Sequence, residues 1–229
     1  MKCAIMQPTY MPWAGYFNLI AEVDHFVFLD DVQFEKQSWQ SRNRVLLGGR
    51  VQWLIVPVRH GSLADPIHSI SVDDTQPWRR KQLTLLENAY ARHPFRDDIL
   101  RLARDILQTP WARLADLNMS LIRRVASQLG LSAQFHRASE LPVAGPRSQR
   151  LVGLCRHLDC DRYLSPVGSA EYLAEDGAFE SADVALSFQD YPVRAYPQKG
   201  VAEFISHLSV LDVVANLGWS GTADYIRCA

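Results

Sequence analysis

The 229-residue sequence has no excess of basic residues and no long apolar run. Lysine and arginine total 24 against 25 aspartates and glutamates, which gives a net charge of −1. Proteins that bind the DNA backbone usually carry a strong basic excess, so we expect no DNA partner. No apolar run approaches the roughly 18–20 residues of a membrane helix, and the first residues lack the pattern of a signal peptide. We therefore expect a chain without a membrane span.

Cysteine is also scarce, and the four cysteines form no C-x-x-C pair. Their even number is compatible with disulfides, but irregular spacing in a chain of this size favours reduced thiols and a cytoplasmic location. The sequence contains no Walker A, G-x-G-x-x-G or zinc-binding pattern, and its histidines lack metal-ligand spacing. These patterns therefore assign no metal ligands, and the sequence leaves metal dependence open and identifies no cofactor. The cysteines are Cys3, Cys155, Cys160 and Cys228.

What the sequence does have is a strand–helix–strand pattern at its start. Residues 2–7 and 25–30 form apolar runs, and residues 14–22 between them read as a helix. Three such elements within about 30 residues predict two parallel strands joined by a helix. Gly48 and Gly49 predict the turn of a hairpin, because glycine adopts a positive φ at little cost. The other expected strands are the hairpin arms 42–47 and 51–58, and the segments 67–72, 162–165 and 184–189.

From Trp78 onward, apolar residues recur three and four positions apart, which predicts amphipathic helices. Further helices are expected near the end of the chain. We therefore expect an α/β fold with a Rossmann-like parallel sheet, built from residues 1–75 and 150–229, and residues 76–149 inserted as a helical unit or cap. The expected helices cover residues 77–91, 97–108, 111–129, 149–157, 169–173 and 206–217.

The segment that follows the first strand is the first candidate site. In open α/β sheets ligands bind beyond the carboxyl ends of the strands, where this segment lies. Its prolines stiffen the loop and its glycine permits close approach of the backbone. The alternative is that its aromatic residues only close the end of the sheet. The candidate binding residues are Gln7, Pro8, Tyr10, Gly15 and Tyr16.

Two carboxylates, Asp30 and Asp31, mark the end of the second strand. Paired carboxylates can hold a divalent metal, or one of them can act as a base with a raised pKa. The alternative is a turn or a helix cap, which aspartate favours. We predict Asp30 and Asp31 as catalytic residues and Gln33 as a binding residue.

The segment 36–44 combines basic residues with a tryptophan. Arginine fits phosphate or carboxylate with two hydrogen bonds, and tryptophan can stack on a sugar or a base. The alternative is a solvated loop before the hairpin. The candidate binding residues here are Lys36, Trp39, Arg42, Asn43 and Arg44.

A similar group of amides and aromatics follows the last strand, although turn structure alone would also explain it. We include Gln189, Tyr191 and Gln198 from this group as binding residues. His207 precedes Ser209 and Asp212, which fits the start of a helix. We treat His207 as a catalytic candidate, with a structural role as the alternative.

Together these motifs resemble the WbqC-like protein family. The matching segments are Gln7–Tyr16, Asp30–Phe34, Ser38–Arg44, Trp53–Pro57 and Leu208–Asp212, and they span nearly the whole chain. Members of this family are often encoded among bacterial genes for O-antigen and other surface polysaccharides. The resemblance implies transfer of an amino acid, glycine in particular, to an amino sugar. It carries over no catalytic residue.

A weaker likeness links the start of the chain to the nucleotidyltransferase-like α/β fold. Those enzymes bind ATP phosphates with an H-x-G-H motif at this junction, but residues 12–16 here contain neither histidine. This departure puts phosphate stabilisation by imidazoles in doubt.

The hypothesis that follows is an acyl or aminoacyl transferase that acts on an amino sugar or a sugar nucleotide. Asp30 or Asp31 would deprotonate the attacking amine, and Arg42 and Arg44 would hold phosphate. The acyl donor stays open between a carrier-protein thioester, a tRNA ester and an adenylate. The alternatives are a nucleotide-binding enzyme of nucleotidyltransferase-like type and a non-catalytic sugar-nucleotide-binding protein of a polysaccharide pathway.

Overall fold

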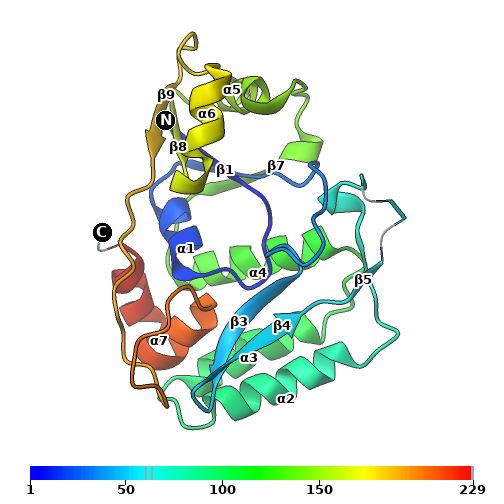
Figure 1. Ribbon diagram of the computed structural model, residues 1–229, viewed down its shortest axis with the longest axis vertical. Coiled ribbons are helices and arrows are strands. Elements are labelled where there is room, and N and C mark those ends of the chain that lie inside the picture. The colour runs from blue at the N-terminus through cyan, green and yellow to red at the C-terminus, as the bar shows by residue number, and fades with distance from the viewer. Residues whose placement is uncertain (60, 63, 228–229) are drawn as a thin grey trace.

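A five-stranded parallel sheet forms the centre of the computed structural model, which describes residues 1–59, 61–62 and 64–227 (Figure 1). β1 and β2 pair in parallel, from Cys3 opposite His25 to Met6 opposite Phe28. This confirms the strand–helix–strand unit and the Rossmann-like α/β fold expected from the sequence. The strand order is β7-β2-β1-β8-β9, and the strands are β1 (Lys2–Met6), β2 (His25–Phe28), β7 (Gln134–Arg137), β8 (Arg162–Ser165) and β9 (Ala185–Phe188).

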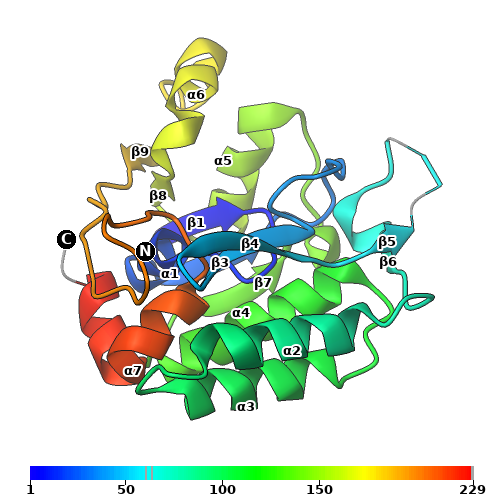
Figure 2. The same cartoon turned by 60° about the horizontal axis from the view of Figure 1, so that its bottom comes forward.

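Helices cover both faces of the sheet, which explains why its central strands read as continuous apolar runs. Alternate residues of β1 and β2 point to opposite faces: Ala4 and Phe26 belong to one hydrophobic core, and Ile5 and Val27 to the other. Figure 2 shows α5 (Arg147–His157) and α6 (Ala170–Asp176) above the sheet. Below it lie α2 (Trp78–Tyr90), α3 (Arg96–Leu107), α4 (Leu114–Gln128) and α7 (Val210–Arg227). Among these helices, α7 packs mainly on α1 (Ala14–Ala21) and on α3.

The predicted hairpin is present as β3 (Arg42–Leu47) and β4 (Arg50–Ile55), joined at Gly48 and Gly49. Both glycines have positive φ, +57° and +77°, as the turn requires. The hairpin packs on α2 (Trp78–Tyr90), which pairs in turn with α3 (Arg96–Leu107).

The sequence prediction missed β7 and placed a strand where little of one exists. β7 lies inside the segment expected to be helical, and its sequence Gln-Phe-His-Arg has a single apolar residue. Residues 67–72 were expected to be a strand, but Ile67–Ser69 form a 3-10 helix after Pro66, and only β6 (Ser71–Val72) pairs, with β5 (Val58–Arg59).

The last expected helix, 206–217, begins only at Val210, and a second helical segment follows it after non-helical backbone at Gly218, where φ is +70°; α7 comprises both segments. Two further short 3-10 helices cover Ala138–Glu140 and Val167–Ser169.

The helices of the expected cap share their core with the sheet. One hydrophobic cluster contains Leu86 of α2, Ile99 of α3 and Leu117 of α4 together with Phe26 and Phe28 of β2. The division of the chain into an α/β core and a helical cap stays a prediction. Within the described part of the chain, no helix has both the length and the apolar character needed to cross a membrane.

Candidate functional site

The order of the strands reverses between β1 and β8. From β1 the chain moves outward to β2 and β7 on one side, and from β8 it moves outward to β9 on the other. In open α/β sheets such a reversal opens a crevice at the carboxyl ends of the two strands, and ligands bind there. The fold therefore directs attention to the loops that follow Met6 and Ser165.

Two adjoining hollows lie at this place, with volumes of about 300 and 350 Å³. They share Met6, Thr9 and Trp39, so we treat them as one site, the switch-point crevice. The first hollow is also lined by Pro12, Trp13, Tyr16, Asn43, Arg44 and His207. The second is also lined by Ile5, Gln7, Leu29, Glu35, Ser38, Gln40, Leu151, Tyr163, Pro166 and Ser169.

The loop between β1 and α1 is held rigidly by hydrogen bonds. The hydroxyl of Tyr16 donates to the carbonyl of Gln7 at 3.0 Å, and Gln40 Nε2 donates to Gln7 Oε1 at 2.8 Å. Asn118 Nδ2, from α4, donates to the carbonyls of Pro8 at 2.9 Å and Gln40 at 2.8 Å. The loop therefore presents a fixed wall to the crevice.

Gly15 makes room for the Trp13 ring in this wall. A Cβ atom at position 15 would lie only 2.2 Å from two carbons of the Trp13 indole. Trp13 in turn lies against the His207 ring, at 4.6 Å between ring centroids, and against Tyr191 at 5.7 Å. Glycine at this position thus determines where the indole sits in the crevice.

Two buried polar atoms of the lining have no hydrogen-bond partner: Thr9 Oγ1 and Arg44 Nε. A buried donor or acceptor without a partner is costly, so these atoms are suited to a ligand. Arg44 also donates from Nη2 to the carbonyl of His207 at 3.4 Å, and its guanidinium lies 5.4 Å from the Trp39 ring centroid. The crevice thus combines a cation with aromatic walls.

His207 is the exposed imidazole of the crevice. It adopts a left-handed backbone conformation with φ of +57°, and its Nδ1 lies 2.8 Å from Ser206 Oγ. It ends the coil of residues 189–207, which we call the strap; the strap joins β9 to α7. Histidine is the side chain that most often serves as a general acid or base in enzymes.

Three predicted residues with acidic or phenolic groups, Tyr10, Asp30 and Asp31, are held elsewhere. Tyr10 is fully buried, its hydroxyl donates to Gln82 Oε1 at 2.7 Å, and burial raises its pKa above the ordinary value. Asp30, also fully buried, accepts hydrogen bonds from Arg137 Nε at 2.5 Å and from Ser139 Oγ at 2.8 Å. Asp31 accepts from both terminal nitrogens of Arg150, one of them at 2.8 Å. None of the three is among the described residues that line the crevice.

Five further predicted residues are not part of the lining of the crevice. Gln189 Nε2 donates to the carbonyl of Gly15 at 2.8 Å and to Asn18 Oδ1 at 2.6 Å, which braces α1. Gln198 holds the strap through the carbonyl of Ile205 at 2.9 Å. Gln33 is exposed and bridges to Pro66 through its backbone. Lys36 and Arg42 line a neighbouring hollow of about 430 Å³ beside the hairpin.

Sequence reasoning missed several residues of the lining. Thr9, Trp13 and Glu35 lie within the motifs that drew attention, so a reading of whole motifs would have included them. Tyr163 and Ser169 come from β8 and the segment after it, and only the strand order brings them to the crevice.

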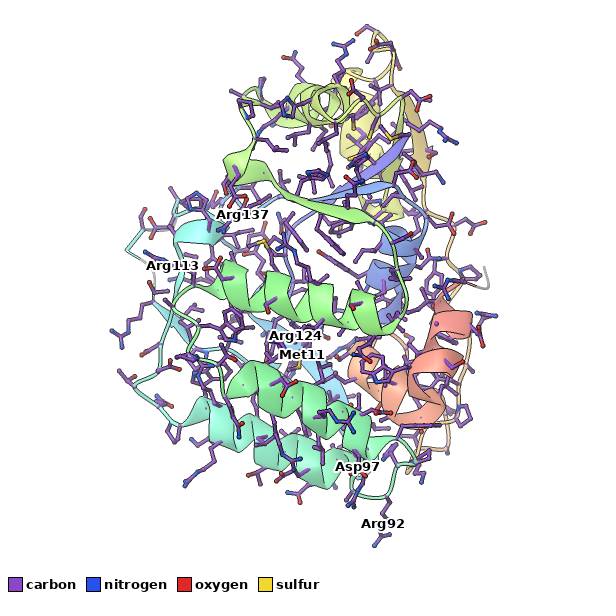
Figure 3. The ribbon with its side chains drawn as sticks, turned by 180° about the vertical axis from the view of Figure 1, so that it is seen from behind. Met11, Arg92, Asp97, Arg113, Arg124 and Arg137 are labelled. Atoms are coloured by element: carbon purple, nitrogen blue, oxygen red, sulfur yellow. The ribbon has the colours of Figure 1, made fainter. Side chains whose placement is uncertain are left out.

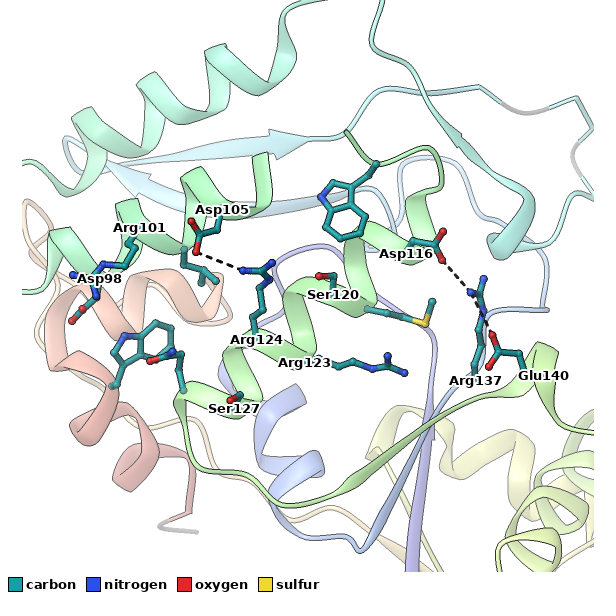
Figure 4. A pocket seen from close by; sticks show the side chains of 15 residues that line it. Asp98, Arg101, Asp105, Asp116, Ser120, Arg123, Arg124, Ser127, Arg137 and Glu140 are labelled. Carbon is teal, nitrogen blue, oxygen red and sulfur yellow. Dashed lines mark hydrogen bonds and ion pairs between the residues drawn. The ribbon is translucent and has the colours of Figure 1, made fainter. Parts of the chain in front are cut away.

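A larger groove of about 600 Å³ lies on the outer side of α4 (Figures 3 and 4). It is lined by four arginines and four carboxylates, several of which pair with one another: Arg124 with Asp105 at 3.5 Å and Arg137 with Asp116 at 3.1 Å. Its charges are balanced and it lies away from the strand reversal. We therefore place the functional site in the crevice, which is smaller but holds unpartnered polar atoms.

The fold and the crevice define an α/β protein of Rossmann-like architecture with a candidate ligand site at the reversal of strand order. The model of the WbqC-like protein family matches residues 7–224, and the chain belongs to that family. It is 32% identical over 229 residues to the uncharacterized protein Rv1507c of Mycobacterium tuberculosis, covering 99% of this chain and 97% of that protein. No solved structure matches the chain.

Proposed function

We propose that this protein is a transferase that binds an amino sugar or sugar nucleotide in the switch-point crevice and acylates its amine, with an aminoacyl group such as glycine as the transferred unit. The observation that carries the proposal is the Arg44 guanidinium, whose buried Nε has no partner, held beside Trp39 at the crevice and next to His207. A guanidinium suits a phosphate or carboxylate, and indole faces suit a sugar ring.

His207 supports the proposal as the base of the reaction. The amine nitrogen of the sugar attacks the carbonyl carbon of an acyl ester, thioester or adenylate. The new C–N bond forms, the C–O or C–S bond of the donor breaks, and the amine loses a proton to the imidazole. In the tautomer in which Nδ1–H of His207 donates to Ser206 Oγ, Nε2 carries the lone pair that accepts that proton.

Asp30 and Asp31 have a structural role in this proposal. Both carboxylate oxygens of Asp30 already accept hydrogen bonds from Arg137 and Ser139, and its side chain is fully buried, so no substrate amine can reach it. Each ties the end of β2 to a neighbouring segment, Asp30 to β7 and Asp31 to α5.

The acyl donor is proposed only as a chemical class, an activated acyl group. A carrier-protein thioester, a tRNA ester and an adenylate all supply an activated carbonyl. We also propose a cytoplasmic location, because Cys3, Cys155 and Cys160 are buried free thiols, as is usual in reducing compartments; Cys228 lies outside the described residues.

The direct test is incubation of the purified protein with amino sugars, sugar nucleotides and candidate donors, followed by mass spectrometry. We expect a mass gain equal to one acyl group on the sugar. His207→Asn should abolish turnover and retain sugar binding, because asparagine tolerates the left-handed backbone at this position. Asp31→Asn is the matched control and should keep turnover. The absence of a mass gain across the panel would contradict the proposal.

A second candidate is a non-catalytic binding protein of a polysaccharide pathway. The observation that favours it is that both carboxylates predicted as bases are paired with arginines. In that case the wild-type protein and His207→Asn would bind the same sugar nucleotide equally well, and neither would transfer an acyl group.

A further inference from the structure

Large apolar side chains are exposed on one side of the hairpin, next to the crevice. Trp39 is 47% exposed, Trp53 41% and Ile55 50%. Tryptophan is costly to leave in water, and exposed apolar groups that cluster beside a cavity mark binding surfaces. This side of the hairpin therefore has the character of a binding surface.

Two arginines lie on the same face as these side chains because residues alternate along a strand. Arg42 pairs with Ile55 and Arg44 with Trp53 across the hairpin, and all four project from one face. The intervening residues Asn43 and Leu54 are buried on the opposite face. The period of two thus separates a core-facing side from a basic, aromatic side.

The arginines and indoles form one continuous stack. The Arg42 guanidinium lies 4.4 Å from the Trp53 ring centroid, and the Trp39 and Trp53 rings are 5.8 Å apart with 31° between their planes. Arg44 lies 5.4 Å from Trp39 and 6.0 Å from Trp53. We call these four side chains, Arg42, Trp53, Trp39 and Arg44, the hairpin stack.

The charges of the hairpin stack are not neutralised by carboxylates. Among the ion pairs of the described residues, none involves Arg42 or Arg44. Stacking occupies the face of a guanidinium and leaves its N–H edges to bind an anion. Arg44 borders the crevice, and Arg42, two positions away on the same strand, borders a separate hollow beside the hairpin.

We infer that the ligand is a sugar linked to a nucleoside diphosphate, and that its nucleotide half binds on the hairpin stack outside the crevice. The base stacks on the exposed indole surface, the two phosphates contact Arg42 and Arg44, and the sugar enters the crevice. The inference rests on the proposed function and narrows its acceptor to a sugar nucleotide. A free amino sugar has neither a base for the indoles nor a diphosphate for two cations.

Calorimetric titration with UDP, GDP, dTDP and inorganic pyrophosphate tests the inference. We expect at least one nucleoside diphosphate to bind roughly tenfold or more tightly than pyrophosphate, since stacking of a base on an aromatic side chain is worth about that much. Trp53→Leu should remove this difference, because leucine offers no ring on which a base can stack. Arg42→Gln should weaken the binding of both the nucleoside diphosphate and pyrophosphate. Arg50→Gln, at the exposed turn of the same hairpin, is the matched control and should change neither.

Equal affinity for pyrophosphate and for every nucleoside diphosphate would overturn the inference, as would an unchanged preference in Trp53→Leu. A thermal melt of each variant verifies that it folds. The same experiments distinguish a failure of this inference from a failure of the proposed transferase function. Acyl transfer to a free amino sugar without any nucleotide binding would refute the inference alone, whereas nucleotide binding that depends on Trp53 without acyl transfer would refute the transferase alone.

Discussion

At the scale of single residues, Gly15 is the position where the crevice is most sensitive to one added carbon. Gly15→Ala would place a Cβ 2.2 Å from the Trp13 indole, so the ring must move from its place in the crevice. Overpacking of this kind costs about 1–3 kcal/mol of stability. We expect a lower Tm and weaker ligand binding, measured by thermal melting and calorimetry.

The control for this prediction is Gly15→Ala made in a protein that also carries Trp13→Leu. Without the indole the added Cβ has little to displace, so the stability cost of Gly15→Ala should fall by more than half. An equal cost in both backgrounds would show that the helix backbone, not the ring, requires glycine.

Asp212 gives the fold a dependence on pH. Burial raises the pKa of this carboxyl to about 6, although hydrogen bonds from Tyr196 and Gln198 oppose the shift. The folded state therefore binds a proton between about pH 4 and pH 6 that the unfolded state releases. The free energy of unfolding falls as the pH rises through this window, by an amount on the order of 3 kcal/mol.

Asp212→Asn should remove this dependence, because asparagine stays neutral and still accepts the hydrogen bond from Tyr196. Relative to the wild type, the variant should gain stability between pH 4 and pH 7, measured by urea unfolding at both values. Parallel pH profiles for the two proteins would contradict the assignment. The comparison cancels the other carboxylates, which titrate in both proteins.

At the scale of elements, the hairpin turn supports the strap. A Cβ atom on Gly49 would lie 2.3 Å from the carbonyl oxygen of Gly200 in the strap, whereas one on Gly48 would meet nothing within 4 Å. Both glycines have positive φ, so alanine costs about 1 kcal/mol at either position for its backbone. Gly49→Ala should cost about 1–3 kcal/mol more than Gly48→Ala.

The measurement is urea unfolding of the two variants, together with limited proteolysis of the strap. We expect faster cleavage within residues 189–207 in Gly49→Ala alone, and weaker ligand binding because the strap carries His207. Equal stability of the two variants would mean that the strap accommodates the extra carbon freely.

The helices and strands differ in how well the sequence predicts them. Strong periodicity located β1, β2, the hairpin and the long helices, and it placed Asp30 and Asp31 correctly at a strand end. β7 was missed because its one apolar residue gives no pattern, and pairing with β2 makes it a strand. The partners of the two aspartates, Arg137 and Arg150, lie 107 and 119 residues away, a distance that no local pattern spans. The carboxylates therefore looked free in the sequence.

At the scale of the whole molecule, the shared core predicts one cooperative unfolding transition. The helices α2–α4 contribute to the same hydrophobic cluster as the sheet, and β7, inside the expected cap, completes the edge of the sheet beside β2. We expect tryptophan fluorescence and far-ultraviolet circular dichroism to give coincident curves in urea. Loss of helical signal before the fluorescence change would instead reveal an independent cap.

The central position of β1 has a consequence for the synthesis of the chain. β1 is made first, but it lies between β2 and β8, and β8 follows β2 by about 130 residues. At ~5–20 residues per second, β8 leaves the ribosome roughly 7–26 s after β2. Throughout that interval the nascent chain carries an apolar strand with one open edge, the kind of edge that other chains can join. Protection of this edge by a chaperone during translation would decide how much of the protein reaches its folded state.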